Sequence, residues 1–93
     1  MRVHWTKAAV EQLDAISAYL SSASPSYALR TVDRTTRKSQ QIALFPLSGR
    51  RVPEYALDQA REVFVDSHRI IYHIKADRID VVTIIHGAML LQS

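Results

Sequence analysis

Three runs of β-type residues in the second half of the chain constrain its fold most strongly. In residues 61–66, two valines alternate with polar or aromatic neighbours, and residues 69–74 and 79–86 are rich in isoleucine, valine and other β-type side chains. Such residues at a period of two favour a pleated, half-buried surface. The connections at residues 67–68 and 75–78 are short. The runs therefore predict three strands of an antiparallel meander.

The middle run divides into two sets of side chains, because successive residues of a strand point to opposite faces. One set is Arg69, Ile71, His73 and Lys75, and the other is Ile70, Tyr72 and Ile74. The first face carries cationic and imidazole groups and the second is apolar. Two interpretations stay open: an ordinary sheet with one solvated side, or a concave basic surface that receives an anionic or acidic partner.

The first half of the chain predicts a short strand and two helices. Residues 2–5 suit a strand, and Thr6 suits the N-cap of a helix. This helix ends within residues 21–23, and its apolar face repeats at spacings of four, three and four. The residues on that face are Ala9, Leu13, Ile16 and Leu20.

A second helix is predicted from about Pro25 to Leu44. Ser24 is an N-cap candidate before a proline at the first helical position, and Pro46 ends the helix by restricting the residue before it. The expected core face is Ala28, Val32, Thr35, Ser39 and Ile42. The opposite face carries Arg30, Arg34, Arg37 and Lys38, and these charges predict that it is exposed to solvent.

The order of elements predicts an α+β fold made of one domain over residues 1–93. The N-terminal strand is expected beside a C-terminal strand, and the two-helix hairpin is expected to pack on a mainly antiparallel sheet of about four strands. Residues 47–54 are expected to form a loop, because Gly49 and Pro53 punctuate them. The apolar tail at residues 88–91 should pack on the sheet or meet a partner.

Composition excludes several classes of protein. A hydrophobic fraction of 47% argues against disorder, and the absence of cysteine excludes a disulfide framework and a thiolate metal site. No signal peptide or membrane span is expected, so the prediction is a soluble, cytoplasmic protein without membrane association. The net charge is +3, which permits nucleic acid or an acidic protein as partner. No metal and no cofactor is predicted.

The motifs along the chain resemble those of the RelE/ParE superfamily, the toxins of bacterial type II toxin–antitoxin systems, with the ParE branch most similar. The resemblance covers nearly the whole length and depends on the order of its parts. These parts are Trp5-Thr6, Ser24-Pro25, Pro46 with Gly49-Arg50, Val52-Pro53-Glu54, Arg61-Glu62, Arg69-Ile70-Ile71-Tyr72 and His86-Gly87.

The resemblance to the ParE branch implies a toxin that inhibits DNA gyrase by binding it and that a cognate antitoxin neutralises. Such antitoxins wrap a disordered, often acidic segment around the toxin, which suits a basic face. This function needs a surface and no catalytic group. The candidate binding residues are Arg50, Arg51, Arg61, Arg69 and His73.

An alternative that the resemblance implies is a ribosome-dependent mRNA endonuclease of the RelE/YoeB type. Glu54 would be the general base, Arg69 the phosphate clamp and His86 the general acid, with Arg61 as a second cation. These groups must converge on one phosphate. Each of these residues also has a non-catalytic alternative. These alternatives are a structural or surface role for Glu54, an ion pair between Arg61 and its neighbour Glu62, and a structural hydrogen bond from His86.

Two departures weigh against RNA cleavage. Residues 45–74 contain no lysine, and no arginine follows His86-Gly87, where many relatives have one. The missing arginine also leaves open a third interpretation, a degenerate relative that is not toxic.

Overall fold

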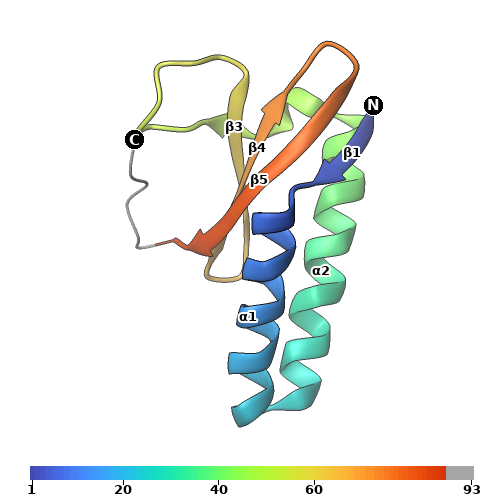
Figure 1. Cartoon of the computed structure of the whole chain (residues 1–93), viewed down its shortest axis with the longest axis vertical. Coiled ribbons are helices and arrows are strands. Elements are labelled where there is room, and N and C mark those ends of the chain that lie inside the picture. The colour runs from blue at the N-terminus through green and yellow to red at the C-terminus, as the bar shows by residue number, and fades with distance from the viewer. Residues whose placement is uncertain (88–93) are drawn as a thin grey trace.

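The computed structural model describes residues 1–87 and has two helices on one face of a five-stranded sheet. In chain order the elements are β1 (Arg2–Trp5), α1 (Lys7–Ala23), α2 (Pro25–Leu44), the 3-10 helix η1 (Pro46–Ser48), β2 (Arg50–Arg51), β3 (Ala60–Val65), β4 (His68–Ile74) and β5 (Arg78–His86). Figure 1 shows α1 and α2 side by side as an antiparallel hairpin. The predicted α+β fold is confirmed.

The strand order is β1-β5-β4-β3-β2, and neighbouring strands are antiparallel except for β1 and β5. The N-terminal strand therefore lies beside the last described strand, as predicted. The sheet has five strands rather than about four, because Arg50–Arg51 pairs with β3 inside the segment expected to be a loop. Two residues are too few for a strand pattern, so only the tertiary pairing reveals β2.

Both helix starts follow from their capping residues. The Thr6 hydroxyl accepts a hydrogen bond from the amide of Ala9 at 3.2 Å, and the Ser24 hydroxyl accepts one from Tyr27 at 3.3 Å. Each hydroxyl satisfies an amide that has no partner within its helix. The predicted range of α2 is confirmed at both ends.

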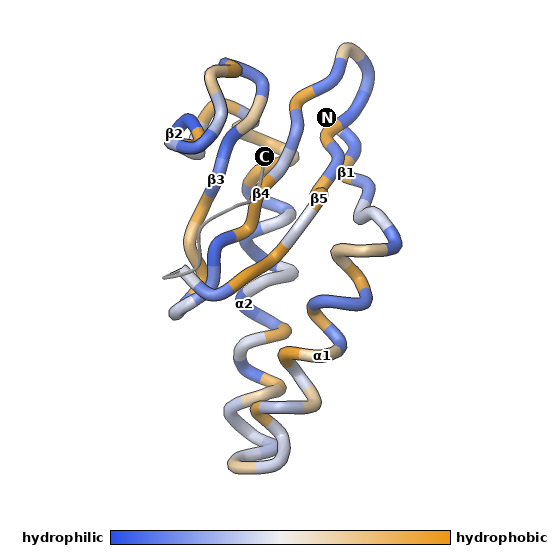
Figure 2. Tube along the Cα trace, turned by 60° about the vertical axis from the view of Figure 1, so that its left-hand side comes forward, coloured by the Kyte–Doolittle hydropathy of each residue, from blue (hydrophilic) through white to orange (hydrophobic). Residues whose placement is uncertain are grey.

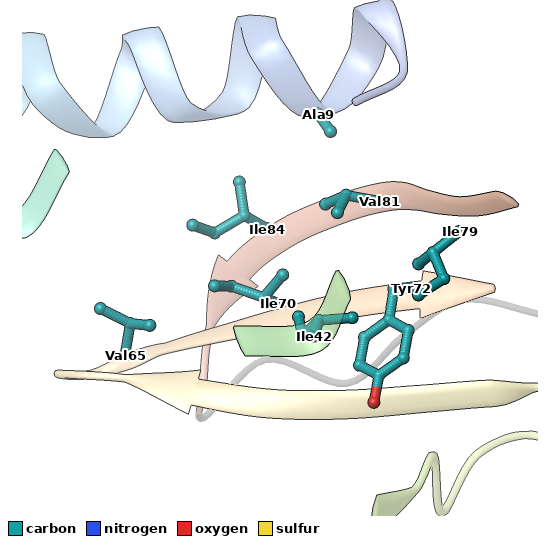
Figure 3. Close-up of a cluster of buried hydrophobic side chains, with 8 residues drawn as sticks. All are labelled: Ala9, Ile42, Val65, Ile70, Tyr72, Ile79, Val81 and Ile84. Atoms are coloured by element: carbon teal, nitrogen blue, oxygen red, sulfur yellow. The ribbon is translucent and has the colours of Figure 1, made fainter. Parts of the chain in front are cut away.

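The main core lies between the helices and the sheet. Figure 3 shows the buried side chains of this core, which come from α1, α2 and strands β3, β4 and β5. Ile70 and Tyr72 of β4 point into it, which confirms the apolar face predicted for this strand. Burying one such side chain contributes about 1.5–3 kcal/mol to folding. In Figure 2 the most hydrophobic segments of the trace concentrate on these strands.

The opposite face of the sheet is partly covered, which corrects the expectation of a simply solvated side. Ile71 is buried there in a second cluster with Val52 and Ala60, against which Tyr55 packs. Val52 and Tyr55 belong to the segment between β2 and β3. That segment therefore folds over the face on which Arg69 lies.

One position of the predicted α2 core face is wrong. Thr31 is buried where Val32 was expected, and Val32 is half-buried. The Thr31 hydroxyl donates to the Asp66 carboxylate at 3.3 Å. A polar residue is preferred at this position because the turn between β3 and β4 presents a carboxylate to the helix.

The far end of the helical hairpin extends beyond the sheet, as Figures 1 and 2 show. Tyr19 and Leu29 are consequently 77% and 73% exposed. The apolar tail at 88–91 lies outside the described residues. Within residues 1–87, neither helix combines the length and apolar character required to cross a bilayer.

Candidate functional site

Arg69 is the centre of a buried charge network on the face of the sheet away from the helices. It lies near the start of β4 and is only 4% exposed. Its two terminal nitrogens donate to the two carboxylate oxygens of Glu54, each at 2.9 Å. Its Nε donates to Oε1 of Glu62 at 3.2 Å. A planar guanidinium that binds two carboxylates in this way is fixed in orientation as well as charge.

Glu62 joins Arg69 to the edge of the sheet. It lies in the middle of β3 with 1% exposure, and its second carboxylate oxygen accepts from Nε of Arg50 at 2.8 Å. We call Arg50, Glu62, Arg69 and Glu54 the charge network; its two cations and two anions balance. The hydrogen bonds that Arg69 donates to Glu54 and, to a smaller extent, to Glu62 raise its pKa above the ordinary value, although burial opposes them. Arg69 therefore carries its charge at every accessible pH.

The sequence did not indicate the role of Glu62. The ion pair between Arg61 and Glu62, which was the alternative to a functional role of Arg61, is not formed, because neighbouring residues of a strand point to opposite faces. Arg61 instead donates to the carbonyl of Asp58 at 2.8 Å and to that of Gly49 at 3.2 Å. The available signal for a buried partner of Arg69 was a glutamate that shares one strand face with Ala60 and Phe64.

The five candidate binding residues do not form one basic surface. Arg50, Arg69 and His73 belong to the face away from the helices, while Arg51 and Arg61 alternate to the other side. Arg51 forms an ion pair with Asp58 at 3.1 Å and is 55% exposed. The guanidinium of Arg50 lies 5.4 Å from the ring centroid of Phe64. The positive charge at this end of the sheet is therefore largely paired.

His86 lies on the other side of the sheet from Glu54 and Arg69. It pairs in register with His68, and the two rings meet edge to face with centroids 6.1 Å apart. Both line an apolar pocket of about 380 Å³ next to α1, together with Ile16. Arg69 instead stands opposite Ile85, which alternates to the far face. The structure brings Glu54 and Arg69 together and leaves His86 apart.

A second ion-pair cluster joins β1, β5 and the turn between β4 and β5. The buried carboxylate of Asp80 accepts from Arg78 at 2.8 Å and contacts Lys75 at 3.0 Å and His4 at 3.5 Å. The hydrogen bonds from Arg78 and then Lys75 lower the pKa of Asp80 to about 2. No group of three or more metal-binding side chains capable of holding an ion occurs in residues 1–87.

The pKa shifts of His68 and Asp80 predict two separate losses of stability in acid. Burial, followed by the nearby His86, lowers the pKa of His68 below 6.5, although Asp66 opposes this. The unfolded chain then protonates His68 first, so stability should fall as pH drops below 6.5. Asp80 stabilises the fold fully above its unfolded pKa of 3.8, and this contribution is lost as pH falls toward about 2.

Urea denaturation across pH 2–8 measures both losses. We expect His68→Gln to flatten the profile just below pH 6.5, and Asp80→Asn to flatten it below about pH 4. Each variant is compared with itself across pH, so a general loss of stability does not obscure the result. An unchanged slope in either window would refute the corresponding assignment.

Comparison with known proteins decides the family. The family model described as the ParE toxin of the type II toxin–antitoxin system, parDE, matches residues 3–91. The chain belongs to the ParE toxin family. A related protein of this kind is Y4kP of Sinorhizobium fredii, which is provisionally named as a toxin; it is 34% identical over 92% of this chain and 88% of Y4kP.

A solved structure from the chromosomal ParDE TA system of P. aeruginosa has the same fold as this ParE-family chain. Its TM-score is 0.74 at 21% sequence identity, and the match covers 92% of this chain and 95% of that one. At this identity the likeness establishes the fold alone. The superfamily and the branch inferred from the motif order are both confirmed.

Proposed function

We propose that this ParE-family chain inhibits bacterial growth by binding DNA gyrase in the cytoplasm, and that a cognate antitoxin neutralises it by binding. The observation that carries the proposal is the match to the ParE toxin family over almost the whole chain. The structural relative comes from a ParDE TA system, which supports an antitoxin as the partner. Arg50 and Arg51 are exposed and remain candidates for contact with either partner.

The geometry of the charge network also supports binding rather than RNA cleavage. A nuclease of the predicted type needs its base, its phosphate clamp and its acid around one phosphate. Here the clamp, Arg69, already binds the two carboxylates of Glu54 and Glu62, and His86 lies across the sheet. Arg69 acts as a structural cation that holds the segment before β3 against the sheet.

The test is induction of this chain in bacteria, with DNA synthesis and protein synthesis labelled separately within minutes. Gyrase inhibition predicts an early stop in DNA synthesis and an SOS response. The purified chain should also block supercoiling by gyrase at micromolar concentration. An early stop in translation with cleaved transcripts would favour the nuclease hypothesis instead. No growth arrest at all would favour the degenerate relative.

Substitution of His86 separates the two mechanisms. His86 is exposed at the end of β5, so His86→Gln should fold normally. We expect growth arrest by this variant to equal that of the native chain, because gyrase binding needs no general acid. Removing a general acid would lower a cleavage rate about 10²–10⁴-fold. A variant that folds normally and no longer arrests growth would therefore contradict the binding mechanism.

A further inference from the structure

Within residues 1–87, the outer edge of β3 is paired over only part of its length. β2 pairs with Arg61 and Glu62 alone, and no other described strand lies on that side of residues 63–65. The turn after β3 has two residues, so Val65 and His68 form its closing, hydrogen-bonded pair. Hydrogen bonding alternates along an antiparallel pair. The amide and carbonyl of Phe64 therefore point outward, to the side where β2 has already ended.

A hollow with a positive lining lies beside this edge. Its volume is about 320 Å³. We call it the basic hollow; its lining residues are Arg34, Arg37, Lys38, Gln41, Phe64, Val65 and Asp66. The lining has three cations and one anion, which is a net charge of +2. Asp66 is only 19% exposed and is bound by Arg34 at 2.8 Å, whereas the Arg37 side chain is 76% exposed.

These two features lie on the same edge, and each selects a property of the partner. The outward N–H and C=O groups of Phe64 can form backbone hydrogen bonds with an extended segment, which is how peptides add to open sheet edges. The basic hollow selects negative side chains. Phe64 lies on the face away from the helices and is 46% exposed, with the Arg50 guanidinium 5.4 Å from its ring centroid. Its ring offers apolar contact to the residue opposite it.

We propose that the β3 edge binds an acidic extended peptide, which adds as a strand beside Phe64 and continues the line of β2. The peptide residue opposite Phe64 is apolar and packs on its ring. The residues before and after it are Asp or Glu, and they point toward α2, where Arg37 and Lys38 lie. This inference rests on the proposed function only for the source of the peptide, an antitoxin segment; the chemistry of the edge stands without it.

The first probe is the blocked peptide Thr-Thr-Glu-Val-Glu-Thr-Thr, added to the isotope-labelled full chain and followed by amide chemical shifts. We expect the Phe64 amide to shift as its hydrogen bond forms, at millimolar peptide. N-methylation of the peptide valine removes the N–H that faces β3 and should weaken binding about tenfold. N-methylation of either glutamate removes an N–H that faces solvent and should leave binding within twofold. Equal effects of the two methylations, or no shift at Phe64, would overturn the proposal.

The second test concerns charge. Arg37→Gln with Lys38→Gln removes two cations and the ion pair with Asp33, and should raise the Kd about fivefold at low salt. Lys7→Gln with Arg30→Gln is the matched control, because it also removes two cations and one helical ion pair, with Glu11. The control should change the Kd less than twofold. Equal losses would show that only net charge matters and would overturn the proposal.

A thymidine oligonucleotide distinguishes nucleic acid from peptide. Tighter binding of the oligonucleotide at the same amides would make nucleic acid the partner and overturn strand addition. Peptide binding is measured without gyrase, so strand addition at β3 and inhibition of gyrase can be refuted separately. A chain that binds the peptide and leaves DNA synthesis unaffected retains the edge site and loses the proposed function. A chain that stops DNA synthesis without binding the peptide gives the reverse result.

Discussion

Replacement of Arg69 by methionine is expected to lower the free energy of unfolding by about 3–5 kcal/mol. Methionine has a similar length and no charge. The substitution leaves the carboxylate of Glu62, which is 1% exposed, with Arg50 as its remaining partner in the charge network. It also releases Glu54 from its bidentate pair. The cost arises from a buried charge that loses its main counterion, and urea denaturation followed by circular dichroism measures it.

Two further variants test this explanation. Arg51→Met removes an exposed arginine that also forms an ion pair, so it should cost about 1 kcal/mol or less. Arg69→Met with Glu62→Leu removes the buried charge together with its partner, and should be more stable than Arg69→Met alone. A double variant less stable than Arg69→Met alone would show that the unpaired Glu62 carboxylate is not the cause of the lost stability. Equal losses for Arg69→Met and Arg51→Met would contradict burial as the cause.

The second large effect is expected from Gly49→Ala, at about 2–4 kcal/mol of lost stability. Gly49 lies between η1 and β2 with φ near −79°, so alanine is compatible with its backbone. The constraint is space, since an added methyl carbon would lie 2.5 Å from the hydroxyl oxygen of Tyr72 and 2.6 Å from the carbonyl oxygen of Glu62. The expected loss combines overpacking, about 1–3 kcal/mol, with damage to local hydrogen bonds, about 1 kcal/mol.

The hydrogen bonds at risk fix η1 to the core. The Tyr72 hydroxyl donates to the carbonyl of Pro46 at 2.6 Å and accepts from the amide of Gly49 at 3.0 Å. Burial raises the pKa of this hydroxyl above 10.0, so it remains a donor at physiological pH. Movement of Tyr72 to admit a methyl group would break both bonds.

Gly87→Ala is the matched control for Gly49→Ala. The nearest atom to a methyl carbon at Gly87 is the carbonyl oxygen of Ser67 at 3.3 Å, so the loss should stay below about 1 kcal/mol. In a Tyr72→Phe background, Gly49→Ala should cost less than in the native chain, because one of the two close atoms is absent. Purely additive losses in the double variant would contradict a clash with the hydroxyl. Thermal or urea unfolding of the four variants measures these differences.

Helix limits could be predicted from the sequence because their causes are local. Thr6 and Ser24 cap helices within three residues of themselves, and Pro46 acts on its own neighbour. The alternation in β4 also predicted which side chains face the helices. The order of short motifs, which is likewise a property of the sequence alone, identified the superfamily and its branch.

The candidate site could be predicted only in part. The endonuclease alternative placed Arg69 and Glu54 at one site. The two residues do lie in contact, but the Arg69 guanidinium is bound to the Glu54 carboxylate in an ion pair. The position of His86 depended on the register between β4 and β5, which residue spacing along one strand does not specify. Whether any of these residues contacts gyrase or an antitoxin stays a prediction.

The sequence by itself determined the order of all elements except η1 and β2, the ends of both helices and the family. Only the tertiary structure decided that Glu62 is buried beside Arg69 and that Arg50 and Arg51 form a strand. It also decided that, within residues 1–87, no strand pairs with the outer side of Phe64, beside α2. The physical reason is that capping and alternation act between near neighbours. Burial, ion pairing and an uncovered edge depend instead on residues that are distant in the chain and meet only in the folded structure.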